Sequence, residues 1–242
     1  MAVDYSRLAA GYDRSRADDR IDREYWLRGL IEVGEIEPGD RILDLGAGTG
    51  RFSRLLSESN PVVALDASGE MLAIARGKGP FAIVQGDAHR LPFRDETFDT
   101  TTVVMVLHHL SDYRSAFREI ARASRRIVIV TSDMARRRLG IMEEAFPSLL
   151  RIDRARFPPI ADVARALESV RFRRVRIEER PFRRAITPKE QIERVRHRYL
   201  STFDLLPPGE FERGLRFLEA ELPRHGDRFE IDASFTFLAG AH

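Results

Sequence analysis

The stretch ILDLGAGTGRF, from Ile42 to Phe52, places three alternating glycines behind a short apolar run. The run predicts a buried strand, and the glycines predict a tight turn into a helix, whose N-terminus can then approach a ligand. Arg51 stands where a dinucleotide-binding turn has its last glycine, and the Gly-Lys-Ser/Thr ending of a P-loop is absent. The ligand therefore need not carry phosphates, and Asp44 at the mouth of the turn indicates that it carries positive charge.

Acidic residues follow or end three neighbouring predicted strands. Asp44 lies in the first, Asp66 ends the second, and Asp87 comes just after the third. The carboxyl ends of parallel strands meet at one edge of an open sheet, where ligands of such folds bind. The carboxylate of Asp66 can accept hydrogen bonds from both hydroxyls of a ribose. The carboxylate of Asp87 can accept a hydrogen bond from an exocyclic amine. Together with the glycine turn, these acids describe a nucleoside with a cationic tail.

Apolar runs alternate with helical patterns through the first half of the chain, which is typical of a parallel sheet covered by helices. Two later segments alternate apolar and polar residues, which predicts half-covered strands paired antiparallel at one edge. We therefore predict an α/β fold, a doubly wound Rossmann-like, seven-stranded and mostly parallel sheet with an antiparallel edge strand and helical cap additions. The expected strands are 41–45, 62–66, 81–85, 100–107, 127–130, 174–178 and 229–237.

The chain of 242 residues is expected to form a single domain. It has no cysteine, which excludes disulfides, thiolate metal sites and cysteine nucleophiles. Its apolar runs are far shorter than the roughly 18 residues that cross a bilayer, so a soluble, cytoplasmic protein is expected. The expected parts are 1–40 as N-terminal lid helices, 41–133 as the ligand-binding core, 134–159 and 183–227 as cap additions, and 160–182 with 228–242 as the C-terminal helix and edge strands.

Four segments carry a resemblance to the class I S-adenosylmethionine-dependent methyltransferases, in that family's order and spacing. They are ILDLGAGTGRFS, VVALDASGEML, VQGDAHRLPFRDETFD and VMVLHHLSD. The resemblance covers residues 41–131 best and is closest to the small-molecule group that includes quinone and sugar O-methyltransferases. It implies S-adenosylmethionine as the cofactor. One departure is Ser124-Arg125-Arg126, which stands where the family usually has a Pro-Gly-Gly turn.

The resemblance also implies a role for each motif. The three glycines would pass under the methionine part of the cofactor, Asp66 would hold the ribose, and Asp87 would read the adenine. Asp44 would order the glycine loop and the ammonium end of the ligand, and Tyr12-Asp13 resembles a lid motif of the family. The implied cofactor-binding residues are Tyr12, Asp44, Gly46, Ala47, Gly48, Gly50, Asp66, Ala67, Met71, Asp87, Ala88 and Val104.

The chemistry of methyl transfer asks little of the side chains. Displacement at a sulfonium is in line, so the protein mainly supplies proximity and alignment, and no metal is required. A base is needed only where the acceptor must lose a proton. Some related sugar O-methyltransferases use a histidine after the fourth strand and an aspartate after the fifth, which implies His108, His109 and Asp133 as candidate catalytic residues. The alternative is that LHHL serves packing and loop structure.

The two cap additions are expected to form the acceptor pocket. Arg136 to Arg138, Arg183 and Arg184 could meet an anionic acceptor, although an arginine run is more often a solvated face. Apolar lining is expected from Met134, Leu139, Ile141, Met142, Phe146, Tyr199, Phe203 and Phe211.

The leading functional prediction is an enzyme that methylates a small organic acceptor at oxygen, nitrogen or an activated carbon. Neither a nucleic acid nor a membrane is an expected partner, and the chain is expected to act as a monomer or homodimer. Two alternatives stay open. One is methylation of RNA, because a group of wobble-uridine tRNA methyltransferases has a similar HH motif, although the net charge of +2 gives little support. The other is a non-catalytic module that keeps the cofactor site.

Overall fold

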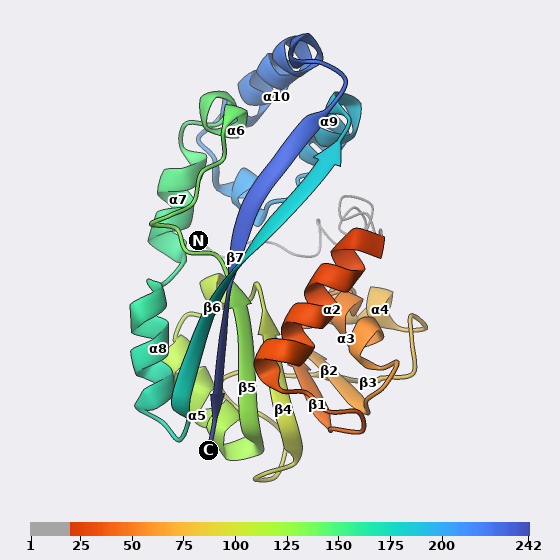
Figure 1. Cartoon of the computed structure of the whole chain (residues 1–242), viewed down its shortest axis with the longest axis vertical. Coiled ribbons are helices and arrows are strands. Elements are labelled where there is room, and N and C mark those ends of the chain that lie inside the picture. Colours follow the sequence, from red (N-terminus) through yellow and green to blue (C-terminus); the bar gives the residue numbers. More distant parts are fainter. Residues whose placement is uncertain (1–19) are drawn as a thin grey trace.

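The computed structural model describes residues 20–242, which form a seven-stranded sheet with helices on both faces and a helical cap at one end (Figure 1). The strand order is β3-β2-β1-β4-β5-β7-β6, which confirms the predicted fold. The strands are β1 (Ile42–Leu45), β2 (Val62–Asp66), β3 (Ala82–Gln85), β4 (Phe98–Val104), β5 (Ser124–Thr131), β6 (Arg173–Ile186) and β7 (Phe229–Ala241). The helices are α2 (Arg20–Gly34), α3 (Arg51–Leu56), α4 (Gly69–Ala75), α5 (Tyr113–Ala123), α6 (Ile141–Ala145), α7 (Leu149–Arg156), α8 (Ile160–Glu168), α9 (Pro188–Arg196) and α10 (Glu210–Glu221), with 3-10 turns η1 (Leu107–His109), η2 (Ser201–Leu205) and η3 (Leu222–His225).

The sheet has a parallel part and an antiparallel edge. Strands β1 to β5 run parallel, whereas β7 is antiparallel to both β5 and β6. Every residue of β1 is buried, as is every residue of β5 from Ile127 to Thr131, because helices cover both faces there. The chain order reverses between β1 and β4. The crevice beyond the carboxyl ends of these two strands is where open α/β sheets bind ligands.

Two apolar clusters hold helices against opposite faces of the sheet. Helices α2 and α3 pack through residues such as Leu30 and Leu56 against one face. Helices α5 and α8 pack through residues such as Phe117 and Val163 against the other. The side chain of Asp112 starts α5 by accepting hydrogen bonds from two backbone amides of the first turn, which is the usual role of an N-terminal cap. This layering keeps the carboxyl edge of the sheet clear of the two main helix layers.

The long strands β6 and β7 form a ribbon that leaves the sheet and carries the cap (Figure 1). Pairing of β7 with β5 ends at Thr236, but its pairing with β6 continues to Phe229, opposite Ile186. Beyond the sheet, α6, α9, η2, α10 and η3 contribute to a separate apolar core. The cap is therefore a small packed unit mounted on the ribbon.

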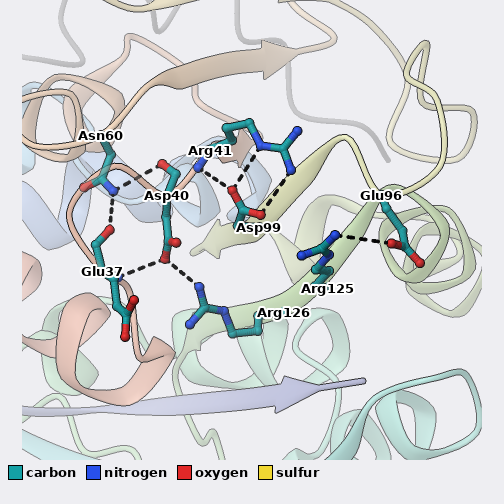
Figure 2. Close-up of polar contacts among 8 residues, drawn as sticks. All are labelled: Glu37, Asp40, Arg41, Asn60, Glu96, Asp99, Arg125 and Arg126. Carbon is teal, nitrogen blue, oxygen red and sulfur yellow. Dashed lines mark hydrogen bonds and ion pairs between the residues drawn. The ribbon is translucent and has the colours of Figure 1, made fainter.

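Ion pairs connect the loops at the amino ends of the strands, on the edge opposite the crevice (Figure 2). The guanidinium of Arg41 makes two hydrogen bonds to Asp99, at 3.0 and 3.1 Å, and these hold the pKa of Asp99 at about 2. Arg126 at the start of β5 donates to Asp40 at 2.5 Å. These contacts tie together the loops that enter β1, β4 and β5.

The structure corrects the predicted end of the fourth strand, and it does not describe the residues of the predicted lid motif. The apolar run to Leu107 was expected to be strand, but β4 ends at Val104, and Met105 has a φ of 56°. This left-handed residue turns the chain into η1. Tyr12 lies outside the described residues. Within residues 20–242, no helix is both long and apolar enough to span a membrane.

Candidate functional site

The glycine loop lies at the carboxyl end of β1, and its backbone conformation explains its composition. Gly46, Gly48 and Gly50 have φ values of 73°, 55° and 76°, a region that residues with a Cβ enter only with strain. A Cβ on Gly46 would lie 2.4 Å from the side chain of Val106. A Cβ on Gly48, in contrast, would meet nothing within 4 Å. The loop is therefore closely packed at its base and open above Gly48.

Asp66 at the end of β2 supports this loop directly. Its Oδ2 accepts a hydrogen bond from the backbone N of Gly48 at 2.7 Å, and its Oδ1 accepts one from the backbone N of Ser68 at 2.8 Å. Ser68 in turn caps α4 by accepting from the backbone N of Met71. The half-buried carboxylate thus fixes the glycine loop and the start of α4 together.

Asp44 lies beneath the loop and is fully buried. Its two oxygens accept hydrogen bonds from the hydroxyls of Ser53 on α3, at 2.5 Å, and Thr102 on β4, at 3.0 Å. Burial raises the pKa of Asp44 to about 6, against the opposing effect of the two hydroxyls. This arrangement explains why a buried strand carries a carboxylate, because Asp44 ties β1, α3 and β4 together under the loop.

Asp87 is exposed on the loop after β3. It accepts hydrogen bonds from the backbone N of His89 at 2.9 Å and contacts the Nδ1 of His89 at 2.7 Å, and these bonds lower its pKa. Its neighbour Ala88 is buried. Met71 on α4 is also buried, whereas Ala67 is exposed. The predicted adenosine-binding residues thus surround the ends of β2 and β3.

A cavity of about 1190 Å³ extends from the glycine loop to the cap. Gly46, Ala47, Gly48 and Val104 line its sheet end, whereas Gly50, Asp44, Asp66 and Asp87 do not line it. Residues 136–142 and 199–202 line its cap end, and both strands of the ribbon contribute to its wall. One continuous space therefore joins the loop to the cap.

Both candidate histidines line this cavity from η1. The ring of His108 stacks on Phe157, with centroids 4.0 Å apart and planes 11° apart. The Nδ1 of His109 lies 3.4 Å from Nη2 of Arg156. A guanidinium can only donate, so Nδ1 of His109 is the acceptor in this contact and the neutral ring carries its proton on Nε2. Asp133 accepts from the backbone N of Ala135 at 3.0 Å and does not line the cavity. Its pairing with a histidine stays a prediction.

The cap supplies only part of the lining expected of it. Leu139, Ile141, Met142 and Tyr199 do line the cavity. Four residues expected there do not, because they belong to the apolar cores within the cap: Met134, Phe146, Phe203 and Phe211.

An aromatic wall, defined by Phe52, Trp26 and Phe235, was not found from the sequence. Trp26 on α2 lies between the other two rings, with centroid distances of 5.6 Å to Phe52 and 4.6 Å to Phe235. All three line the cavity. They come from α3, α2 and β7, so no local sequence pattern brings them together.

Comparison with known proteins agrees with this architecture. A family model described as a methyltransferase domain matches residues 43–127. A demethylmenaquinone methyltransferase of Mycobacterium marinum is 41% identical over 127 residues, which are 52% of this chain and 54% of that protein. A ubiquinone/menaquinone biosynthesis C-methyltransferase of Pseudomonas paraeruginosa is 36% identical over 108 residues, 40% of this chain and 42% of that protein. The chain thus spans about half the length of the curated relatives it matches.

Solved structures share the fold over nearly the whole chain. One from Anabaena variabilis, described as a methyltransferase of an antibiotic biosynthesis pathway, has a TM-score of 0.73 at 23% identity and covers 93% of this chain and 99% of its own. The [4+2]-cyclase SpnF has a TM-score of 0.58 at 18% identity, and the match covers 95% of this chain and 85% of SpnF. Because a cyclase shares the fold, the fold alone does not determine the reaction. Residues 43–127 thus match a methyltransferase domain, and the described chain shares the fold of solved methyltransferase structures.

Proposed function

We propose that this protein transfers a methyl group from S-adenosylmethionine to a small organic acceptor bound under the cap. One observation carries the proposal: a single cavity runs from the glycine loop to the space between the sheet and the cap. A donor held over the loop and an acceptor held under the cap would therefore meet inside one space. Holding two reactants in that way is the main contribution that an enzyme can make to a displacement reaction.

The residues around the loop fit the cofactor. The open space above Gly48 leaves room for a ligand against the backbone, and Asp66 and Asp87 present carboxylates at the ends of the next two strands. We infer that the loop would hold the methionine part, Asp66 the ribose and Asp87 the adenine, with Ala67, Met71, Ala88 and Val104 beside them. When bound, S-adenosylmethionine supplies a methyl group on a sulfonium.

We infer that a histidine of η1 supplies the base where the acceptor must lose a proton. Both line the cavity beside the end of β4, and the contact with Arg156 leaves Nε2 of His109 as a donor. A neutral His109 would therefore position an acceptor by donating a hydrogen bond, and His108 is the better candidate to accept a proton. Alanine substitutions separate these roles. Full turnover in both His108→Ala and His109→Ala would show that neither is a base.

Two experiments test the proposal. The first is calorimetric titration of the purified protein with S-adenosylhomocysteine, for which we expect micromolar binding. The second offers labelled S-adenosylmethionine with a metabolite extract, with a quinol as a representative aromatic acceptor, and with total tRNA. Label in the extract or the quinol supports a small-molecule acceptor. Label in tRNA alone would contradict it, and binding without transfer to any pool would favour a non-catalytic module.

The small-molecule acceptor is favoured over RNA by the shape of the site. The cap covers the cavity end where the acceptor would lie, so the space is sized for a metabolite. The printed names of the relatives point to quinone precursors, and the aromatic wall suits a ring of that kind. A quinone acceptor itself rests on those names and is tested by the quinol arm.

A further inference from the structure

Arg137 differs from three other arginines that line the cavity, Arg136, Arg184 and Arg194. Arg136 pairs with Glu179, and Arg184 donates to Glu190 at 2.9 Å. Arg194 lies over the ring of Tyr199 and donates to a neighbouring amide. In Arg137 the Nη1 atom is buried and has no hydrogen-bond partner among residues 20–242. The guanidinium of Arg137 is thus buried beside the cavity with one nitrogen that donates no hydrogen bond to the described residues.

The charge of Arg137 is only partly balanced by the protein. Burial lowers its pKa, and the negative charges of Tyr199 and Asp153 oppose this effect. Asp153 is already engaged, because it accepts from Thr202 and lies 3.7 Å from Arg156. A buried guanidinium in such surroundings is stabilised most by an anion that forms hydrogen bonds with it.

The aromatic wall connects Arg137 with the glycine loop. The guanidinium carbon of Arg137 lies 5.8 Å from the ring centroid of Phe235, which packs on Trp26. Trp26 in turn contacts Phe52 on α3, directly after the loop. A molecule lying along this wall would have an apolar surface beneath its body, the guanidinium at one end and the proposed methyl donor at the other.

We propose that Arg137 binds an oxyanion of the acceptor, so that the substrate is an organic anion with a flat apolar body. The inference rests on the proposed function and adds the class of acceptor to it. Carboxylate and phosphate share this chemistry, since both match the fork of a guanidinium. The distance between the anion and the methylated atom would be set by the length of the wall.

The test uses three probes that share one ring system: biphenyl-4-carboxylate, biphenyl-4-yl phosphate and the neutral biphenyl-4-methanol. Binding of each to the wild-type protein saturated with S-adenosylhomocysteine is measured by calorimetry or ligand-observed NMR. We expect at least one anion to bind roughly tenfold more tightly than the alcohol, since a charge-assisted pair is stronger than a neutral hydrogen bond. The preferred anion identifies the acid group. Equal binding of alcohol and anions would overturn the inference.

Variants locate the effect. Arg137→Gln should reduce that preference to about twofold or less, whereas Arg151→Gln, which removes an exposed arginine of α7 outside the cavity, should leave it unchanged. An undiminished preference in Arg137→Gln would assign the anion to another group and overturn the proposal. If Arg137→Gln does not fold, the three probes on the wild-type protein still decide whether the pocket selects anions, and Arg137→Lys should retain part of the preference. Binding of S-adenosylhomocysteine is measured separately, so failure of the cofactor site is distinguished from failure of the anion site.

Discussion

The two ends of the cavity are built in different ways. At the sheet end, the glycine loop follows β1, Asp44 lies in β1 and Asp66 ends β2, and hydrogen bonds to nearby backbone and hydroxyl groups hold them. At the cap end, the lining comes from segments far apart in sequence, which pack around an apolar core of their own. The contacts at the sheet end hold the backbone of the glycine loop in one conformation. The packing of the cap determines the size of the pocket at the other end. A site of this kind can keep its cofactor geometry while the acceptor pocket varies.

The largest expected effect is a loss of stability in the cap that leaves cofactor binding at the sheet end unchanged. Phe146 is fully buried in the cap core, where its ring lies 4.9 Å from that of Phe203. Phe146→Ala should lower the free energy of unfolding by about 3 to 4 kcal/mol, because it leaves a cavity. Hydrogen exchange should accelerate in the cap, and calorimetry should show affinity for S-adenosylhomocysteine within about twofold of wild type if the two ends are independent. A parallel loss of cofactor affinity would contradict that independence.

The second prediction breaks the sheet end. Asp66→Ala removes the acceptor for the amide of Gly48 as well as the proposed ribose ligand. We expect affinity for S-adenosylhomocysteine to fall roughly hundredfold by calorimetry, because a positioned loop and a charge-assisted bond are lost together. Asp227→Ala, at an exposed acid of the cap for which no role in the site is proposed, serves as the control. Near-wild-type affinity in Asp66→Ala would refute the ribose assignment.

The third prediction concerns pH and the buried acid beneath the loop. The folded pKa of Asp44 is about 6, above its ordinary value, so between pH 4 and 6 the folded state holds a proton that the unfolded state has released. Stability should therefore fall as pH rises through this range, by about 2 to 3 kcal/mol from this group. The difference in urea denaturation between wild type and Asp44→Asn should reproduce that slope. A difference that does not change with pH would mean that Asp44 is ionised throughout.

The smallest expected effect distinguishes the cost of backbone strain at a glycine from the loss of room for the ligand. Gly48 and Gly77 have positive φ values of 55° and 79°, and a Cβ at either would meet nothing within 4 Å. Alanine at either position should cost about 1 kcal/mol of stability. Only Gly48→Ala should also weaken S-adenosylhomocysteine binding, by roughly tenfold, because the new methyl group would occupy space needed by the ligand. Equal affinities in the two variants would show that the space above Gly48 is not used.

The same contrast explains what the sequence could predict. The glycine turn and Asp66 lie at the strand ends that the sequence predicts, because regular apolar runs mark β1 and β2. The end of β4 was placed three residues too late, because Val106 and Leu107 continue the apolar run although Met105 turns the chain. Phe146 and Phe203 were assigned to the pocket because composition does not show which apolar side chains the cap needs for its own core. Arg137 could not be distinguished from Arg136 or Arg138, since only their different burial and partners separate them.

The ribbon of β6 and β7 affects how the substrate specificity of such a protein can change. Residues 187–228 leave the ribbon after Ile186 and return at Phe229, and these two positions pair directly. An insert whose ends already lie side by side can be lengthened or exchanged at little entropic cost. Such an exchange would leave the register of the strands unaltered, so this segment can be treated as a cassette. Grafting it between related chains, together with residues 134–145, which include Arg137 and α6, would test whether acceptor choice moves with the cap while the donor site is retained.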